Sequence, residues 1–365
     1  MLVGIDASRA TLPPRTGTEN YSVGLIRALV ERGRHRYRLY FRQPPPAELV
    51  DVDAERRVLP APRLWTHTRL TAELRRQPPD ALLVPAHVLP ATHPPASVVT
   101  VHDVGFRYYP EAYPVRQLLY LDLSTRWAAR RAARLLADSE ATRQDIHQLY
   151  RVPLDRIHVA YPAVDAQFTP AAAPDEAERL RAAYDLSDAY VLYVGTLQPR
   201  KNVGVLIDAL ARLPRGDVTL ALAGGAGWRG EADRLRDQVT RLGLWGRVRF
   251  LGHVPAADLP ALMRQAVALA LPSLHEGFGM PLAEAMACGA PTLAANTSCL
   301  PEVVGDAGRL LPPRVPDAWA EAFTRLLDDS ALRADLRARG IARAATFTWQ
   351  RAAEVAEGAL DEIRD

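Results

Sequence analysis

The sequence contains almost no lysine: of its 45 basic residues, all but Lys201 are arginine. It has only two cysteines, Cys288 and Cys299, which are too few and too close together for a disulfide framework, so a reducing compartment is expected. No apolar run approaches the ~20 residues of a membrane span, and the first residues lack the layout of a signal peptide. We therefore expect a cytoplasmic protein.

A strong excess of one charge is also absent, because 42 acidic residues leave a net charge of only +3, spread over both halves of the chain. This balance does not indicate a nucleic-acid partner. The nine histidines show no tight metal-ligand spacing. The carboxylates of Asp51-Val-Asp53 lie in a polar stretch after three prolines, not at the end of an apolar strand. We therefore expect neither a metal site nor a bound cofactor.

Short aliphatic runs alternate with longer amphipathic ones, and this alternation occurs twice along the chain. It predicts parallel sheets covered by helices on both faces. The expected strands are Leu2–Asp6, Arg38–Phe41, Ala81–Val84, Ser97–Val101, Leu135–Asp138, Tyr190–Gly195, Val218–Ala223, Val248–Leu251, Val267–Leu271 and Pro291–Ala294. The expected helices are Asn20–Glu31, Leu118–Ala133, Val203–Leu213, Glu231–Leu242, Pro281–Cys288 and Trp349–Ile363.

The predicted fold is therefore α/β, with two Rossmann-like domains facing across a cleft. A stretch rich in Pro and Ala, Tyr161–Glu176, is expected to be the interdomain linker. Residues 1–165 would form the first domain, residues 175–345 the second, and the helix in residues 346–365 would return to the first. Ligands of such sheets bind beyond the carboxyl ends of the strands, so the loops that follow strands are the places to search.

One glycine-rich loop matches a dinucleotide-binding pattern. Gly225-Ala-Gly227-Trp-Arg-Gly230 has the spacing G-x-G-x-x-G after a strand and before a helix. The pattern belongs, however, to the first strand of its domain, and it requires an acidic residue at the end of the next strand, where this chain has Gly252-His253. A glycine turn near the cleft is the simpler interpretation.

The stretch LPSLHEGFGMPLAEAMACGAPTLAAN, Leu271–Asn296, carries the strongest signal. A buried strand leads into a glycine-bracketed loop with Glu276, and a helix begins near Met280-Pro281, where proline suits the first turn. Free backbone N–H groups at such a helix start attract anions. Glu284 lies one turn into this helix, and its apolar neighbours Ala283 and Ala285 argue against a solvated surface residue. The two carboxylates are expected to bind hydroxyl-rich ligands.

Together with LYVGTLQPRKN upstream, LPEVVGDAGRLL downstream, and TVHDVGF and ADSEATRQDI in the first half, this stretch resembles the retaining GT-B-fold nucleotide-sugar glycosyltransferases of family four, also called group 1. The resemblance covers essentially the whole chain. It implies that Glu276 holds the transferred sugar and Glu284 the nucleotide ribose. It further implies that the backbone of Gly277, Phe278, Gly279 and Met280 contacts the donor sugar or phosphate. Two apolar residues, Leu282 and Val254, would lie near the base.

The same resemblance assigns a role to the single lysine. Arg200 and Lys201 correspond to the basic pair that binds the donor diphosphate, whose negative charge grows as the sugar–phosphate bond breaks. The alternative is a solvated loop lysine. Many family members place an arginine directly after the glycine that ends the preceding strand. Here Thr196 occupies that position in the donor site, so Arg200 would be the only guanidinium on the phosphates.

In the first half, Gly17-Thr18 before a helix resembles the family's glycine loop, which approaches the phosphate or the acceptor. His102 ends an inner strand, and the resemblance places it beside the reacting sugar as part of the catalytic centre. A satisfied core histidine is the alternative, and Asp103 is expected to turn outward or to orient the local backbone. Ser139 or Thr142 is expected to cap a helix.

The resemblance implies transfer of a hexose, with mannose from GDP-mannose as the first choice, to a hydroxyl of a glycan or lipid-linked acceptor in surface polysaccharide synthesis. UDP-sugar donors stay open, and retention without a metal rests on the family alone. The alternatives are a UDP-sugar 2-epimerase, an NAD-dependent oxidoreductase and a non-catalytic sugar-binding protein. An arginine-rich helix at Thr125–Leu136 with Trp127 suggests peripheral contact with the inner membrane face; a basic solvated face is the alternative.

Overall fold

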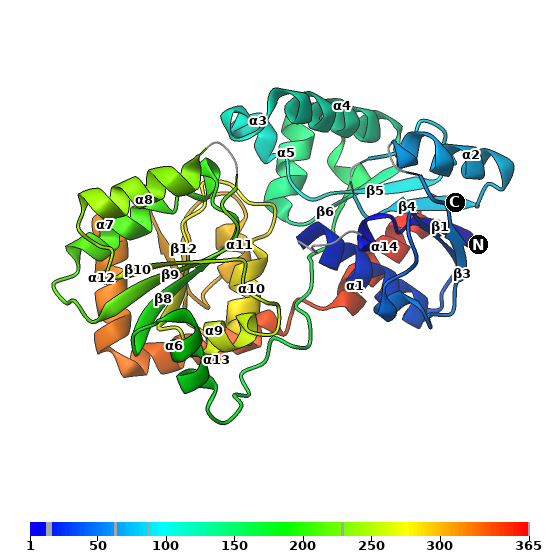
Figure 1. Cartoon of the computed structure of the whole chain (residues 1–365). Coiled ribbons are helices and arrows are strands. Elements are labelled where there is room, and N and C mark those ends of the chain that lie inside the picture. The colour runs from blue at the N-terminus through cyan, green and yellow to red at the C-terminus, as the bar shows by residue number, and fades with distance from the viewer. Residues whose placement is uncertain (12–16, 62–63, 87, 228–229, 364–365) are drawn as a thin grey trace. The chain divides into compact units, whose positions relative to one another are not determined.

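The computed structural model describes residues 1–365 except 12–16, 62–63, 87, 228–229 and 364–365. The chain divides into two compact units (Figure 1). The first unit combines Met1–Ala163 with the C-terminal segment Thr348–Asp365, and the second is Val164–Phe347. The boundary after Ala163 lies in a stretch without regular structure, which lasts until a helix begins at Glu176.

The first unit contains a parallel seven-stranded sheet in the order β3-β2-β1-β4-β5-β6-β7. Its strands are β1 (Leu2–Asp6), β2 (Arg36–Phe41), β3 (Glu55–Val58), β4 (Ala81–Val84), β5 (Ser97–Val101), β6 (Arg134–Ala137) and β7 (Ile157–Val159). Its helices are α1 (Gly17–Arg32), α2 (Arg69–Arg76), α3 (Gly105–Tyr108), α4 (Val115–Arg131), α5 (Glu140–Tyr150) and α14 (Trp349–Asp361). Short 3₁₀ turns are η1 (Arg9–Thr11), η2 (Ala47–Leu49), η3 (Trp65–His67), η4 (Pro110–Ala112) and η5 (Leu154–Arg156).

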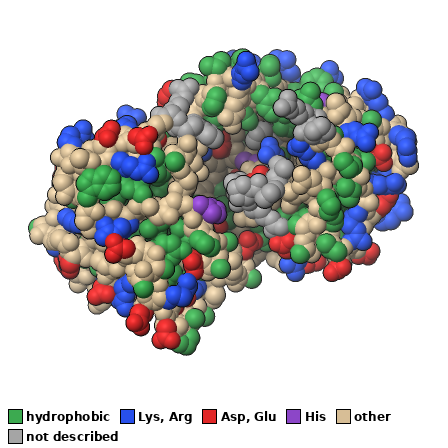
Figure 2. Space-filling view, viewed as in Figure 1, with side chains coloured by type: hydrophobic (Ala, Val, Ile, Leu, Met, Phe, Trp, Pro, Cys, Tyr) green, Lys and Arg blue, Asp and Glu red, His purple; other side chains and the backbone are tan. Residues whose placement is uncertain are grey.

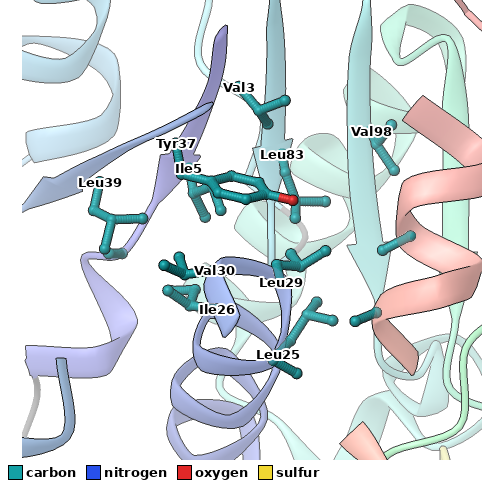
Figure 3. Packing of buried hydrophobic residues seen from close by; sticks show 14 of the residues in the cluster. Val3, Ile5, Leu25, Ile26, Leu29, Val30, Tyr37, Leu39, Leu83 and Val98 are labelled. Atoms are coloured by element: carbon teal, nitrogen blue, oxygen red, sulfur yellow. The ribbon is translucent and has the colours of Figure 1, made fainter. Parts of the chain in front are cut away.

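One hydrophobic core of this unit lies between the sheet and the pair α1 and α14, and a second contains residues of α2, α4 and α5. Figure 3 shows Leu25, Ile26 and Leu29 of α1 pointing toward strand residues such as Ile5 and Leu83. These residues are fully buried, as expected for a parallel sheet with helices over its faces.

The C-terminal helix α14 is attached to α1 by close packing and by a buried ion pair. A Cβ on Gly24 of α1 would lie 2.2 Å from the Trp349 ring, so only glycine permits this approach. Arg32 Nε donates to the buried Glu357 carboxylate at 2.9 Å. The last segment of the chain is therefore an integral part of the first unit.

The second unit contains a parallel six-stranded sheet in the order β10-β9-β8-β11-β12-β13. Its strands are β8 (Ala189–Val194), β9 (Val218–Ala223), β10 (Val248–Gly252), β11 (Ala268–Leu271), β12 (Thr292–Ala295) and β13 (Arg309–Leu311). Its helices are α6 (Glu176–Tyr184), α7 (Gly204–Arg212), α8 (Glu231–Arg241), α9 (Leu259–Gln265), α10 (Met280–Ala287), α11 (Leu300–Val304), α12 (Pro316–Asp328) and α13 (Ser330–Ala344), with the 3₁₀ turn η6 (Pro199–Lys201).

All ten predicted strands are confirmed to within two residues, and so is the alternation with helices. Three strands were not predicted: β3, β7 and β13, which lie at sheet edges. β3 reads Glu-Arg-Arg-Val and is mostly exposed. Such short, charged segments are typical of edge strands and lack the apolar signal of inner ones.

In each unit the strand order reverses direction at one place. This occurs between β1 and β4 in the first sheet and between β8 and β11 in the second. The loops after the two strands at such a switch point diverge and leave a crevice beyond the carboxyl edge. In the second unit these are the loops that carry Arg200, Lys201 and Glu276.

Candidate functional site

Three charged side chains meet at the switch point of the second unit. Glu276 accepts a hydrogen bond from Lys201 Nζ and lies 3.3 Å from Arg200 Nη1. The exposed fractions of the three side chains are only 8% for Glu276, 11% for Arg200 and 14% for Lys201. The sequence analysis predicted the basic pair for the diphosphate and Glu276 for the sugar. The structure brings them together as one buried cluster with two positive charges and one negative charge.

The loop after β8 is held in place by Asn202. This residue has a φ of +56°, in the left-handed region that asparagine tolerates. Its amide Nδ2 donates to Pro272 O at 3.1 Å and to Pro313 O at 2.6 Å. The backbone N–H of Leu274 donates to Arg200 O at 2.8 Å, which joins the two loops directly. Sequence reasoning missed Asn202, although an asparagine just after a 3₁₀ turn is a signal for a positive φ.

The Glu276 loop has its own supports, which sequence reasoning also missed. Ser273 Oγ donates to Glu276 Oε1 at 2.7 Å. Ser298 Oγ donates to the Glu276 carbonyl at 2.8 Å, and Cys299 Sγ donates to the same oxygen at 3.2 Å. Ser298 and Cys299 lie 22 and 23 residues from Glu276 along the chain, so the sequence does not reveal these contacts. Both the backbone and the carboxylate of Glu276 are thus fixed before any ligand arrives.

The charges of the cluster set the ionisation of Glu276. Burial alone would raise the pKa of its carboxyl group, but the charges of Lys201 and Arg200 outweigh burial and hold the pKa below its usual value. Glu276 is therefore ionised at neutral pH. The cluster then carries a net charge of +1 in a poorly solvated place, which favours binding of an anion.

The helix start after Glu276 has the expected form, since α10 begins at Met280 with proline in its first turn. Gly279 has a φ of +88°, and a Cβ there would lie 2.8 Å from Leu300 Cδ2. Phe278 is buried and packs edge-on against Phe347, with ring centres 5.1 Å apart. Leu282 is completely buried. The predicted donor contacts from Phe278 and Leu282 can therefore involve only their backbones, as can those from the glycines Gly277 and Gly279.

Glu284 lies in the middle of α10 and is half-buried. Burial, and to a smaller extent the negative charge of Asp165, raises the pKa of its carboxyl group to about 8. The side chain is thus held mainly in the neutral form at pH 7. A carboxyl group of this kind can donate a hydrogen bond as well as accept one.

The remaining predicted donor residues lie on neighbouring loops. Thr196 is exposed just after β8, whereas the side chain of Val254 is buried after β10. A Cβ on Gly227 would lie 2.0 Å from Leu197 O, so this glycine allows two loops to touch. The glycine-rich loop thereby supports the segment that carries Thr196. Trp228 and Arg229 of the rejected dinucleotide pattern lie outside the described residues.

In the first unit, His102 follows β5 and forms a pair with Asp138 at the end of β6. Its Nδ1 lies 2.8 Å from Asp138 Oδ2, and its Nε2 lies 3.1 Å from Pro85 O. Tyr21 packs edge-on against the imidazole, with ring centres 4.8 Å apart. Asp103 is turned to its own backbone and accepts from Gly105 N–H at 2.9 Å. Sequence reasoning missed Asp138 because it is 36 residues away.

Both ring nitrogens of His102 face oxygen acceptors. A carbonyl oxygen cannot donate, so the Nε2 contact requires a proton on Nε2, and the Nδ1 contact requires a second proton between Nδ1 and Asp138. Burial would lower the pKa of His102, but the charge of Asp138 and its hydrogen bond outweigh burial and raise it. Burial raises the pKa of Asp138, against the influence of His102. The pair therefore holds two protons and is suited to donate, not to accept, a proton.

The loop after β1 leads to α1, which begins at Gly17 with Thr18 as its second residue. The residues before Gly17 lie outside the described part of the chain. Beside the β1–β4 switch point is a pocket of about 250 Å³. It is lined by charged, polar and aromatic side chains together with a few apolar ones: Asp6, Ser8, Arg9, Arg42, Leu64, Trp65, Thr66, His67, Ala86, Val88 and Tyr120.

Two further expectations concern the first unit. Ser139 caps α5 by accepting from Thr142 N–H at 3.1 Å, which confirms the predicted cap. The helix expected at Thr125–Leu136 is wrong in its bounds, because α4 ends at Arg131 and a strand begins at Arg134. Trp127 packs against the core, with the Arg131 guanidinium 4.9 Å from its ring centre. It is therefore not available as an interfacial anchor.

The part of the chain that the structure describes contains no helix long and apolar enough to cross a membrane. Within the same residues, no three His, Cys, Asp or Glu side chains are grouped so that they could hold a metal ion.

Two parallel Rossmann-like sheets of this order define the architecture, and comparison with known structures identifies it as the GT-B fold. The Anabaena protein HepE, solved in complex with UDP-glucose, superimposes with a TM-score of 0.76 at 23% identity over 98% of both chains. The model of the family "Glycosyl transferases group 1" matches residues 175–343, and that of "Glycosyltransferase Family 4" matches residues 15–168.

Among curated proteins, the O-antigen chain mannosyltransferase B of Escherichia coli is 34% identical over 92% of this chain and 93% of its own length. A D-inositol 3-phosphate glycosyltransferase of Jonesia denitrificans is 36% identical over 61% of this chain, which spans about half (55%) of that relative. The chain belongs to the group 1 glycosyltransferases, which confirms the family and the GT-B fold expected from the motifs.

Proposed function

We propose that this glycosyltransferase moves a hexose from a nucleoside diphosphate-sugar to a hydroxyl group of a glycan or lipid-linked acceptor in surface polysaccharide synthesis. The observation that carries the proposal is the buried cluster of Arg200, Lys201 and Glu276 at a switch point. The name of the Escherichia coli relative supports mannose as the sugar and GDP-mannose as the first donor to test.

In the proposed reaction, Arg200 and Lys201 bind the diphosphate of the donor. Their charge exceeds that of Glu276 by one, so the cluster attracts the negatively charged diphosphate. A fixed cation about 4 Å from a charge is worth about 4 kcal/mol at an effective dielectric constant near 20, before desolvation costs. Because the leaving diphosphate gains negative charge as the bond breaks, this attraction is greater in the transition state.

Glu276 would accept hydrogen bonds from hydroxyl groups of the transferred sugar. Its ionised carboxylate is the form needed for that role, and sugar hydroxyls are natural donors to it. When the diphosphate draws on the two cations, the bonds that Glu276 makes to them weaken, and its oxygens become available to the sugar. We propose that this exchange of partners couples diphosphate binding to recognition of the sugar.

The rest of the donor is assigned to α10 and its neighbours. Backbone N–H groups from Gly277 through Met280 would bind the sugar or phosphate, because they lie at the start of α10, where the helix dipole favours negative charge. Glu284 would hold the ribose. Thr196 would lie near the donor, with Val254 and the backbone of Leu282 near the base.

His102 would act from the first unit as a positive charge beside the reacting sugar, with its two ring nitrogens held by Asp138 and Pro85. With two protons on the pair, it is poorly suited to be the base that activates the acceptor. The proposed step therefore has the acceptor hydroxyl attack the anomeric carbon from the face that the diphosphate leaves. The departing phosphate oxygen takes the hydroxyl proton, so that the anomeric configuration is retained. No enzyme nucleophile, metal or cofactor takes part in this proposal.

The pocket beside the β1–β4 switch point is proposed as the acceptor site, with Gly17 and Thr18 at the neighbouring helix start. Its combination of the buried carboxylate Asp6, guanidinium groups and the exposed ring of Tyr120 is typical of sites that bind a saccharide. A volume of about 250 Å³ accommodates one sugar unit rather than a long glycan.

The direct test is a panel of nucleotide sugars incubated with the purified protein, with and without divalent metal, and with slow release of nucleoside diphosphate as the readout. We expect one donor to be hydrolysed without metal and the Lys201→Ala variant to lose this activity, while Lys201→Arg keeps part of it. Turnover or binding of NAD with no response to any nucleotide sugar would overturn the proposal. So would epimerised UDP-sugar without diphosphate release.

A further inference from the structure

The chain leaves the second unit through a short segment that carries two aromatic side chains, Phe347 and Trp349. Phe347 is the last residue of the second unit, and Trp349 is the first residue of α14 in the first unit. We call residues 347–349 the crossing segment. Because the two rings are only two residues apart in the sequence, this segment contributes one ring to each unit. Each ring contacts an aromatic residue that belongs to the candidate site of its own unit.

In the second unit, Phe347 supports the loop that leads into α10. Its ring meets the ring of Phe278 at an interplanar angle of 90°, with centres 5.1 Å apart. The second unit exposes basic and acidic side chains over much of the face shown in Figure 2, whereas these two rings are only 4% and 3% exposed. Edge-to-face contacts of this kind are favourable beyond the burial of area and favour one orientation of the rings. The position of Phe278 therefore depends on Phe347.

Phe347 is itself held from two sides. The guanidinium of Arg343 lies over its ring, 4.9 Å from the centre, and donates to the carbonyl oxygens of Glu302 and Val303 in α11 at 2.6 Å and 3.0 Å. The backbone carbonyl of Phe347 accepts from Val164 N–H at 3.4 Å. Val164 is the first residue of the second unit, so the two points where the chain enters and leaves this unit are joined at Phe347. These contacts give Phe347 a defined position.

In the first unit, Trp349 has the corresponding place beside the histidine pair. Its ring lies edge-on to that of Tyr21, with centres 5.8 Å apart, and Tyr21 lies edge-on to His102, with centres 4.8 Å apart. The missing side chain of Gly24 lets α1 approach the Trp349 ring closely. Trp349 thus supports Tyr21, and Tyr21 supports the imidazole.

We propose that the crossing segment positions the functional groups of both units. Phe347 acts through Phe278 on the backbone N–H groups assigned to the donor. Trp349 acts through Tyr21 on the imidazole of His102. Both are positioning residues, because each acts through another side chain. The inference rests on the proposed donor site and on the proposed role of the imidazole.

Core packing alone is the alternative for both rings, and it predicts a different result. The loss of a ring that only fills space lowers the melting temperature without a selective effect on one kinetic constant. The loss of a positioning residue also changes the kinetics, because small displacements of binding or catalytic groups are costly. Each variant is therefore compared with one that removes a buried ring elsewhere in the same unit.

The donor side is tested with Phe347→Leu. Its matched control is Phe323→Leu, since Phe323 is a fully buried ring in α12 of the same unit. Hydrolysis of GDP-mannose, and of UDP-glucose in parallel, gives kcat and KM. We expect both variants to melt at a lower temperature, but only Phe347→Leu to raise KM, by about tenfold, with kcat within about threefold of the parent. Phe278→Leu should raise KM similarly. The double variant should be no worse than either single one, because the two rings act as a unit.

The histidine side is tested with Trp349→Leu, for which Trp349→Phe is the conservative variant. We expect Trp349→Leu to lower kcat about tenfold with little change in KM. Trp349→Phe should keep most of the activity, because a ring still meets Tyr21. The control is Phe41→Leu, which removes a fully buried ring of β2 from the same core and should retain kcat.

The outcomes separate this inference from the function on which it rests. A parent chain that hydrolyses no nucleotide sugar of the panel would overturn the proposed function and this inference with it. If the parent is active but Phe347→Leu or Trp349→Leu has the kinetic constants of its control, the inference is overturned for that unit. Additive effects of Phe347→Leu and Phe278→Leu on KM would show that Phe347 does not act through Phe278, which would also overturn it there.

Discussion

The two units each hold a buried ionic group at the carboxyl edge of a sheet, but they are built from different kinds of charge. In the second unit, Arg200 and Lys201 are permanent cations around one carboxylate. In the first unit, His102 and Asp138 form a pair in which both members titrate and share two protons. The first arrangement keeps its charge over a wide pH range, whereas the second depends on pH.

This difference corresponds to two chemical tasks. A group that must neutralise a diphosphate throughout the reaction benefits from a fixed charge, for which an arginine and a lysine are suited. A group beside a reacting sugar benefits from a positive charge that its partner sustains. Variants that remove the fixed charge should therefore affect activity differently from variants that alter the partner of the imidazole.

The largest effect is expected for Lys201→Ala. Loss of one preorganised donor to a leaving group typically lowers kcat by about 10²–10³-fold. Because the variant also removes a buried partner of Glu276, we expect about 1–3 kcal/mol less stability as well. Steady-state donor hydrolysis and urea unfolding measure the two effects separately. Adding Glu276→Gln should restore stability but not activity. Activity within a few-fold of the parent in Lys201→Ala would remove the diphosphate role.

The next effect concerns the titrating pair. His102 has a raised pKa, so its charge is present at low pH and is lost as the pH rises through that pKa. We expect kcat/KM to fall on the alkaline side for this reason. Asp138→Asn removes the carboxylate that sustains the imidazolium, so the fall should move to lower pH, with about 10–100-fold less activity at neutral pH.

The pH–rate profile of each variant checks this assignment. In Asp138→Asn, a lower kcat with little change in KM would place His102 in the transition state, whereas a mere packing defect would not move the profile along the pH axis. Tyr21, which packs against the imidazole, provides a control: Tyr21→Phe keeps the ring contact and should preserve the profile. An alkaline limb that does not shift in Asp138→Asn would refute the shared-proton arrangement.

The sequence predicts the inner strands and the donor cluster for the same reason. Strands buried on both faces are continuous apolar runs, so their ends are visible, and the residues just past them must meet at one edge of the sheet. Arg200, Lys201 and Glu276 lie on loops that follow such strands, and the resemblance to the glycosyltransferase family assigned them to the donor. The charged edge strand β3 gives no comparable pattern.

The sequence could not predict the hydrogen-bond partners of the site residues. Asp138 contacts His102 across 36 residues, and Asn202 contacts Pro313 across 111. Hydrogen bonds of this range depend on how the sheet is assembled. The arginine-rich helix was predicted at Thr125–Leu136, whereas α4 ends at Arg131, and the exposure of Leu119 and Leu123 on this helix follows only from packing.

A smaller effect is expected for Glu284→Gln, which should raise the stability of the protein and lower its affinity for the nucleotide. The folded-state pKa of Glu284 is raised to about 8, so its stabilising contribution is complete below pH 4.5 and is lost as the pH rises through about 8. The neutral glutamine avoids this loss and should stabilise the protein by about 1–3 kcal/mol at pH 8, with little effect at pH 4.5. If Glu284 binds the ribose, nucleotide affinity should meanwhile fall about tenfold.

Thermal melting at both pH values and calorimetric titration with the nucleoside diphosphate separate these two outcomes. Proton release on nucleotide binding by the parent, absent in Glu284→Gln, would show that the ligand stabilises the ionised form. Equal affinity in the variant and the parent would leave Glu284 as a structural residue of α10.

The smallest effect is expected for the glycine that shapes the helix start. Gly279 has a φ of +88°, which disfavours any side chain, and the new Cβ of Gly279→Ala would lie 2.8 Å from Leu300. We therefore expect this variant to lose about 1–2 kcal/mol in the free energy of unfolding. Gly216→Ala is the matched control, because its Cβ meets nothing within 4 Å and its φ is ordinary. Urea denaturation of both variants gives the difference. Because Gly279 lies among the residues whose N–H groups are proposed to bind the donor, its variant should also raise KM for the nucleotide sugar more than it lowers kcat. If Gly279→Ala were as stable as Gly216→Ala and as active as the parent, the loop would adapt freely, and its preorganisation would have no part in donor binding.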